Sequence, residues 1–153
     1  MVGTGPSVKE ILSASQRDGL KNVHISGVVP LPKALELTAQ SQVVVVPLRE
    51  TLHTRTCCPT KLVQYSAMGK AIVTIAVSDV ALALKKDAAA VVVSPAYVQS
   101  FPRAVKVLLK DPKRRGDIGE RAKFVFANYD WEEISKPLLA LYGGAPLLRG
   151  DLI

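Results

Sequence analysis

The 153-residue sequence has few aromatic residues and few cysteines. Its three Phe, four Tyr and one Trp, set against abundant Ala, Val and Leu, favour helices packed on a buried sheet over a β-sandwich. The two cysteines, Cys57 and Cys58, are adjacent in the sequence, which is too close for an ordinary disulfide and fits a reducing compartment. Together with His53 and a distant His24 they do not form a four-ligand metal set, so no metal is expected.

Long apolar runs are also missing. The longest, Val43–Val46 and Ala88–Val93, fall far short of the roughly 18 residues that a membrane-spanning helix needs. The amino-terminal residues have neither the basic nor the apolar region of a secretion signal. Integral membrane and exported classes are therefore excluded. We expect a cytoplasmic protein, and the sequence is compatible with peripheral contact at the inner face of the membrane.

The charge is basic, with 20 Lys and Arg against 13 Asp and Glu and a net charge of +7. Basic residues are dense over residues 103–123. Such a segment is compatible with a solvated helix face, with nucleic acid, with anionic lipid or with a phosphorylated ligand. A nucleic-acid partner is not expected, because the nearby aromatic residues are better explained as core or cap positions: Phe124, Phe126, Tyr129 and Trp131.

Stretches rich in β-branched residues predict strands over Val23–Ser26, Val43–Pro47, Ala71–Val77 and Ala88–Val93. Val43–Val46 and Ile72–Ile75 do not alternate with polar residues, so both faces of these strands should be buried, as in a parallel sheet. Helical patterns separate the strands: one after a capping Ser7, one over Leu31–Thr38 and one over Leu62–Ala67. This order predicts an α/β fold, a Rossmann-like doubly wound parallel sheet with helices on both faces.

After the last strand the pattern is helical. One helix should begin at Ser100-Phe101-Pro102 and end at Asp111-Pro112, and the next should follow directly. Asp130–Glu133 has the spacing of a capping box for a last helix, which Pro137 should kink or interrupt. We expect one domain over residues 1–142 and a tail over residues 143–153.

The amino-terminal end is unusual, because Met1-Val2 reads as the stump of a strand and most of the leading strand is missing. The sequence therefore predicts that the chain is a fragment of a longer protein. Gly3-Thr4-Gly5 follows as a Gly-x-Gly turn, which lets backbone approach a ligand and presents a helix amino terminus to an anion. A tight turn without a ligand explains the same residues, since the third glycine of the dinucleotide fingerprint is absent.

A second candidate site lies where a helix begins at Pro59 or Thr60, after the strand Val43–Pro47. The first-turn N–H groups of Thr60, Lys61 and Leu62 should point to the carboxyl ends of the strands, where open α/β sheets bind ligands. Lys61 adds a cation that suits a phosphate, and Gln64 lies one turn further on, where it could bond a sugar hydroxyl. The alternative is an ordinary helix with solvated Lys and Gln side chains.

Five segments in order resemble the C-terminal, nucleotide-sugar-binding domain of group 1 (family 4) GT-B glycosyltransferases. They are residues 3–6, 22–30, 39–47, 59–73 and 129–132. The resemblance runs from about residue 1 to Tyr142. It implies one half of a GT-B enzyme that transfers a hexosyl group from a UDP-, GDP- or ADP-sugar to an acceptor. The nucleotide sugar would be a substrate, no separate cofactor is implied, and the acceptor would be held by a further, amino-terminal domain.

By this resemblance the base lies against the backbone around residues 28–30, the diphosphate at the helix start of residues 60–62 and the ribose at position 64. The implied donor-binding residues are Gly3, Gly5, Val28, Val29, Pro30, Thr60, Lys61, Leu62 and Gln64. No catalytic residue is implied for this chain.

The sequence departs from the family pattern at several positions. Gln64 and Thr56 stand where the family usually has a pair of Glu, and Ser78-Asp79 stands where glycines are common. The basic residues that usually neutralise the donor diphosphate come from a segment before Gly3. We therefore expect no transfer by the isolated chain, and the alternative is a non-catalytic module that binds a nucleotide or a partner.

Overall fold

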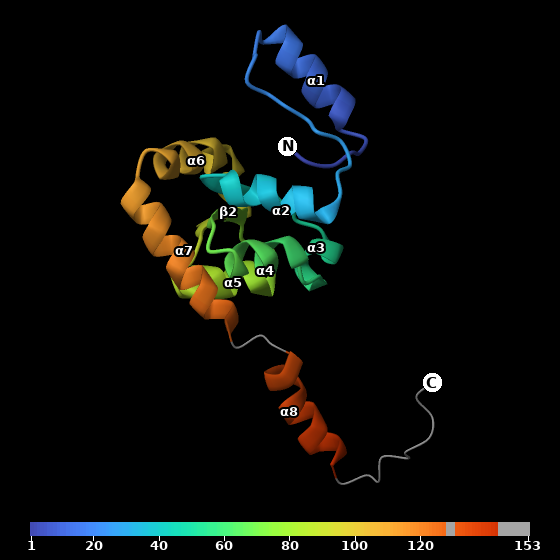
Figure 1. Ribbon diagram of the computed structural model, residues 1–153, viewed down its shortest axis with the longest axis vertical. Coiled ribbons are helices and arrows are strands. Elements are labelled where there is room, and N and C mark those ends of the chain that lie inside the picture. Colours follow the sequence, from blue (N-terminus) through green and yellow to red (C-terminus); the bar gives the residue numbers. More distant parts are fainter. Residues whose placement is uncertain (128–130, 144–153) are drawn as a thin grey trace. The chain divides into compact units, whose positions relative to one another are not determined.

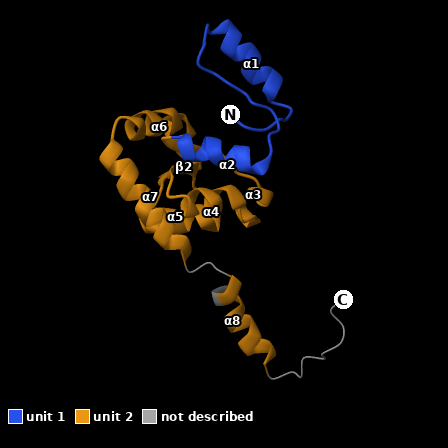
Figure 2. Cartoon of the chain, viewed as in Figure 1, with its two compact units in different colours: residues 1–41 blue, residues 42–153 orange. Residues whose placement is uncertain are grey.

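The computed structural model describes residues 1–127 and 131–143, in two compact units that comprise residues 1–41 and 42–153 (Figures 1 and 2). Unit 1 contains α1 (Val8–Arg17) and α2 (Leu31–Gln40). Unit 2 contains, in chain order, β1 (Val43–Val46), α3 (Leu52–Thr56), α4 (Thr60–Ala67), β2 (Ala71–Ile75), α5 (Asp79–Lys86), β3 (Val91–Val93), the 3-10 helix η1 (Pro95–Ser100), α6 (Phe101–Leu109), α7 (Pro112–Ala127) and α8 (Trp131–Tyr142).

The strands of unit 2 form a parallel three-stranded sheet in the order β1-β2-β3. Val43 is paired with Ala71, and Val73 with Val91, so the strands are nearly level with one another. Helices connect the strands, as parallel pairing requires, and the carboxyl ends of all three strands lie at the same edge.

Helices cover both faces of this sheet, and Figure 1 shows α4 and α6 on opposite sides of β2. Val44, Val46 and Ile72 face the side chains of α4, α5 and α7. On the other face, Ala71 and Val73 pack with Leu108 of α6, and with one residue of α7. The predicted Rossmann-like α/β fold is confirmed.

The strands are shorter than the sequence pattern predicts. β2 ends at Ile75, and β3 begins only at Val91, because Ala88 adopts a left-handed conformation (φ 49°) in the turn after α5. Every residue of β2 is buried, as expected, but Val45 of β1 is 45% exposed. The expectation that both faces of Val43–Val46 are buried is therefore wrong at Val45, because β1 is an edge strand of this sheet.

In unit 1 the predicted strand over Val23–Ser26 does not form. The segment is extended beside the first residues of the chain, but their only β-pairing is one isolated antiparallel bridge between Gly3 and Gly27. Among residues 1–41 the one buried side chain is Ser15, so no apolar core holds a strand in place. Ser7 is the N-cap of α1, as predicted, but its side chain makes no capping hydrogen bond.

Most of the predicted helix boundaries in unit 2 are confirmed. Pro102 lies in the first turn of α6, and the Asp111 carboxylate accepts a hydrogen bond from the Arg114 amide at the start of α7. The sequence analysis missed α3 and also α5, whose first turn is capped by the Ser78 hydroxyl, an acceptor for the Ala81 amide. Residues 128–130 and 144–153, which include Asp130 of the expected capping box and nearly all of the expected tail, lie outside the described residues.

α8 runs through Pro137 as one helix, without the interruption that the sequence suggests. A proline removes one backbone N–H and leaves one carbonyl without its helical partner. Pro137 is exposed, so water can hydrate that carbonyl and the helix continues.

The carboxyl end of α4 packs against α7 through two glycines. Gly69 has a φ of 63°, and the Gly69 and Lys70 amides donate to the Ser66 and Tyr65 carbonyls, which is a Schellman motif that closes α4. Gly119 of α7 lies so close that a Cβ on it would overlap the Gly69 carbonyl oxygen. This contact fixes α4 against the core.

Gly119→Ala is expected to lower the free energy of unfolding by about 1–3 kcal/mol, because the added methyl group must displace the backbone of Gly69. The matched control is Gly116→Ala in the same helix, where nothing lies within 4 Å of the position that the new methyl group would take. That variant should gain about 0.5–1 kcal/mol from the better helix propensity of alanine. Chemical denaturation of both variants checks the difference, and equal stabilities would contradict the close contact.

Candidate functional site

The candidate site is the amino-terminal turn of α4, which follows the carboxyl end of β1. Pro59 occupies the N-cap position, and no side chain caps the helix. The Leu62 amide donates to the Pro59 carbonyl at 2.9 Å, whereas the Thr60 and Lys61 amides have no hydrogen-bond partner in the described part of the chain. Two backbone donors therefore remain available at the positive end of the helix dipole.

The two faces of α4 differ in burial. Leu62 and Ser66 are fully buried, and Leu62 belongs to the core that contains Val44 and Ile72. Thr60, Lys61 and Gln64 are exposed. Lys61 and Gln64 are three residues apart and so lie next to each other on the exposed face. The structure thus brings together three of the predicted residues, while the Leu62 side chain is part of the core and cannot reach a ligand.

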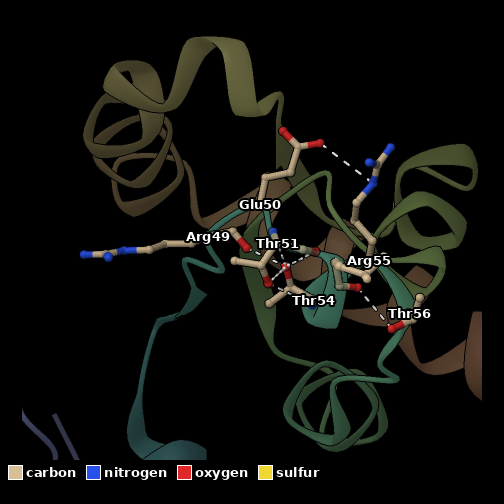
Figure 3. Close-up of polar contacts among 7 residues, drawn as sticks. Arg49, Glu50, Thr51, Thr54, Arg55 and Thr56 are labelled. Atoms are coloured by element: carbon tan, nitrogen blue, oxygen red, sulfur yellow. Dashed lines mark hydrogen bonds and ion pairs between the residues drawn. The ribbon is translucent and has the colours of Figure 1, made fainter.

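The segment between β1 and α4 is organised by threonine hydroxyls (Figure 3). Thr51 and Thr54 form a capping box at α3: the Thr54 amide donates to the Thr51 hydroxyl at 3.1 Å, and the Thr51 amide donates to the Thr54 hydroxyl at 2.9 Å. The Thr54 hydroxyl in turn donates to the Arg49 carbonyl at 2.6 Å. These bonds hold residues 49–56, which include the short helix α3, in a defined connection that we call the loop before α4.

This loop carries two arginines that the sequence analysis did not single out. The Arg55 side chain faces Glu50, with 3.9 Å between Nε and a carboxylate oxygen, and the Arg49 side chain extends away from the threonine cluster (Figure 3). Both arginines are exposed, and they belong to the same end of the sheet as the start of α4. Their one signal in the sequence is their place between a buried strand and the candidate helix start.

The other predicted site residues lie in unit 1. Gly3 has a φ of 120°, which favours glycine, and its amide donates to the Gly27 carbonyl at 2.7 Å. Gly27 directly precedes the predicted base-contacting residues, of which Val28 is 80% exposed. Val29 is half-buried and Pro30, the N-cap residue of α2, is exposed. Gly5 is exposed in the turn before α1.

Neither a metal cluster nor a membrane span is found in the described ranges. No group of three or more His, Cys, Asp or Glu side chains there could hold a metal ion. Cys57 and Cys58 are free thiols. No helix among these residues is both long and apolar enough to cross a membrane.

Comparison with known families settles the family of the chain. Residues 1–111 match the family described as "Glycosyl transferases group 1". The chain belongs to this family. The match includes the candidate helix start and both segments of unit 1 that carry predicted site residues, so the resemblance drawn from the sequence is confirmed. A comparison with curated protein sequences found no match.

Solved structures show the same fold. The chain is similar to sucrose-phosphate synthase from Thermosynechococcus elongatus, with a TM-score of 0.70 and 20% identity over 94% of this chain. It is also similar to WaaG, a glycosyltransferase involved in lipopolysaccharide biosynthesis, with a TM-score of 0.70 and 17% identity over 95% of this chain. In each case the chain spans 37% of the length of the other protein.

We expect Thr54→Val to loosen the loop before α4, because the variant keeps the shape of the side chain but loses the hydroxyl that bonds the Arg49 carbonyl. Hydrogen exchange should accelerate at the backbone amides of residues 49–56, with a loss of about 1 kcal/mol of local stability. Thr56→Val is the control, because the Thr56 hydroxyl bonds only to carbonyls within its own helix, those of Leu52 and His53. Equal acceleration in both variants would contradict a special role for Thr54.

Proposed function

We propose that this chain binds the nucleotide-sugar donor of a group 1 glycosyltransferase and that the donor diphosphate lies at the start of α4. The observation that carries the proposal is the pair of unpartnered amides at Thr60 and Lys61, at the carboxyl end of β1. Backbone donors and the helix dipole both favour an anion at this position. The Lys61 side chain adds a positive charge beside them.

Gln64 suits the ribose in this arrangement. Its side chain is exposed one turn after Lys61, and an amide can both donate to and accept from a sugar hydroxyl. A core role for Gln64 does not agree with this exposure. By the resemblance to the family, the base would lie against the backbone of Val28, Val29 and Pro30, and Gly3 and Gly5 would allow close approach of the turn before α1.

The arginines of the loop before α4 are candidate sources of further positive charge. Arg49 has no ion-pair partner in the described part of the chain, whereas Arg55 shares its charge with Glu50. A diphosphate carries more negative charge than Lys61 alone offsets, and each added cation would stabilise it. Arg49 is therefore the first residue to examine after Lys61.

For the whole enzyme we propose transfer of a hexosyl group from a UDP-, GDP- or ADP-sugar to an acceptor held by a further domain. In such a reaction the groups at the start of α4 would stabilise the departing nucleoside diphosphate. A second candidate function is a non-catalytic nucleotide-binding module. It is favoured by Gln64 and Thr56, which stand where the family pattern has carboxylates.

Nucleoside diphosphates are expected to bind at the start of α4. In an NMR titration with UDP, GDP and ADP, at least one should shift the backbone amides of residues 58–64 and saturate. Lys61→Ala should raise its Kd by about tenfold, the effect of one charge-assisted hydrogen bond at an exposed position. Lys106→Ala, which removes an exposed lysine from α6, is the control and should leave the Kd within about twofold. The absence of shifts at residues 58–64 with all three nucleotides would refute the proposal.

Gln64→Glu should bind the same nucleotide as tightly as the original chain or a few-fold more tightly, because a carboxylate accepts a stronger hydrogen bond from a ribose hydroxyl than an amide does. Gln64→Leu, which can form no such bond, should bind more weakly. Both variants should keep their stability within about 0.5 kcal/mol, since the position is exposed. Calorimetry and thermal unfolding test this, and a parallel loss of binding and folding in Gln64→Glu would assign the residue to the core instead.

A further inference from the structure

A cavity lies at the edge of the sheet opposite β1. It has a volume of about 530 Å³ and is formed by β3, η1, α6 and the first turn of α7. The order β1-β2-β3 places the whole of β2 between this cavity and the strand that leads to α4. None of its lining residues belongs to the candidate donor site. Its volume is within the usual range of about 300–1,000 Å³ for small-molecule pockets.

The floor of this β3–α6 cavity is apolar and its polar groups are few. Val91 and Val93 contribute from β3, and Val107 and Leu108 from α6. Ser94 also lines it, and the hydroxyl of this residue has no hydrogen-bond partner among the described residues. An apolar wall with a small number of polar groups is the usual make-up of a site for a largely apolar ligand.

Two guanidinium groups give the cavity its charge. Arg103 of α6 and Arg114 of α7 both line it, and no acidic residue does. Neither side chain has an ion-pair or hydrogen-bond partner among the residues that the structure describes. The nearby Asp111 carboxylate is engaged by the Arg114 backbone amide at 2.9 Å. Two arginines together can hold a phosphate or carboxylate in a bidentate manner.

The edge of β3 that faces away from β2 is unpaired among the residues that the structure describes, and it adds a backbone donor and acceptor. The Val93 carbonyl accepts from the Ala76 amide at 2.9 Å, so Val93 faces the chain that continues β2. Peptide groups of successive strand residues point to opposite sides, so those of Val92 point to the open edge. Because β3 has only three residues, a peptide added as a further strand would find one outward-facing residue to pair with. This short edge favours a small molecule over an added strand.

We propose that the β3–α6 cavity binds an amphiphilic anion, a molecule with a phosphate or carboxylate head and an apolar body. The head lies between Arg103 and Arg114, and the body covers the valines of β3 and α6. The ligand is either a free amphiphile or the head and first carbons of an anionic membrane lipid, which have the same chemistry. The site is independent of nucleotide binding at α4.

The test is an NMR titration of the full chain with octyl phosphate below its micelle concentration. Saturable shifts are expected at the amides of Val92, Ser94 and Arg103. Inorganic phosphate lacks the apolar body, and octyl glucoside has the same alkyl chain with an uncharged head. Each should bind at least about tenfold more weakly if both parts of the cavity contribute. Shifts spread evenly over α6 and α7, or binding of inorganic phosphate as tight as that of octyl phosphate, would overturn the proposal.

A pair of charge-matched variants separates the cavity from the general basic surface. Arg103→Ala/Arg114→Ala should raise the Kd for octyl phosphate by about tenfold or more. Lys106→Ala/Lys113→Ala removes the same charge from exposed residues of α6 and α7 that do not line the cavity, and should change the Kd by less than about twofold. Equal losses in the two variants would overturn the proposal. Thermal unfolding of both shows that they are folded, and Val107→Trp, which fills the cavity, should abolish binding without any change of charge.

Vesicles identify the source of the ligand. If phosphatidylglycerol vesicles bind the chain and the Arg103→Ala/Arg114→Ala variant loses this binding, the ligand is an anionic lipid. If octyl phosphate binds but vesicles do not, the ligand is a free amphiphile; both results support the cavity as the site. Binding of an extended acidic peptide at the Val92 amide, with none of octyl phosphate, would overturn the proposal in favour of strand addition.

Discussion

Burial of β2 on both faces is the constraint on which the rest of unit 2 depends. All five residues of this strand are buried, between β1 and β3 and between two layers of helices. The Thr74 hydroxyl inside the sheet donates to the Val46 carbonyl at 3.0 Å, so the one polar side chain of the strand is also satisfied. A strand in this position can be covered only if helices return to each face, which is why the chain alternates strand and helix.

The sequence is a good guide to this central part and a poor one to the edges. Ala71–Ile75 could be predicted because a run whose one polar residue is Thr74, with no alternation of polar and apolar residues, favours burial between two helix layers. Val45 is exposed although it reads like its neighbours, because exposure depends on the position of the strand in the sheet rather than on the residue. Val23–Ser26 has strand propensity but forms no strand, since a strand needs partners that unit 1 does not supply. Strand propensity is a local property of the sequence, whereas the pairing of strands and their burial by helices depend on tertiary structure.

The candidate site, too, could be predicted from the sequence only in part. The two ends of α4 could be predicted, because Pro59 marks the start of a helix and Gly69 marks its end. The loop before α4 could not, since its shape depends on side-chain hydrogen bonds between Thr51 and Thr54 and from the Thr54 hydroxyl to the Arg49 carbonyl. The β3–α6 cavity is even harder to predict from the sequence than this loop. Its two arginines are eleven positions apart on different helices, and only packing places both on one cavity.

The way α4 is held has a consequence for any ligand at its amino terminus. Leu62 and Ser66 are immobilised in the core, and the carboxyl end of the helix rests against Gly119. The backbone of residues 60 and 61 is therefore ordered before any ligand arrives. When a ligand bonds to these two amides, the protein backbone loses little conformational entropy. Most of the entropy loss on binding comes from long side chains that become ordered, such as those of Lys61 and Arg49. Selectivity at this end of the sheet should then rest on rigid backbone, while affinity is tuned by side chains that can be exchanged without disturbing the fold.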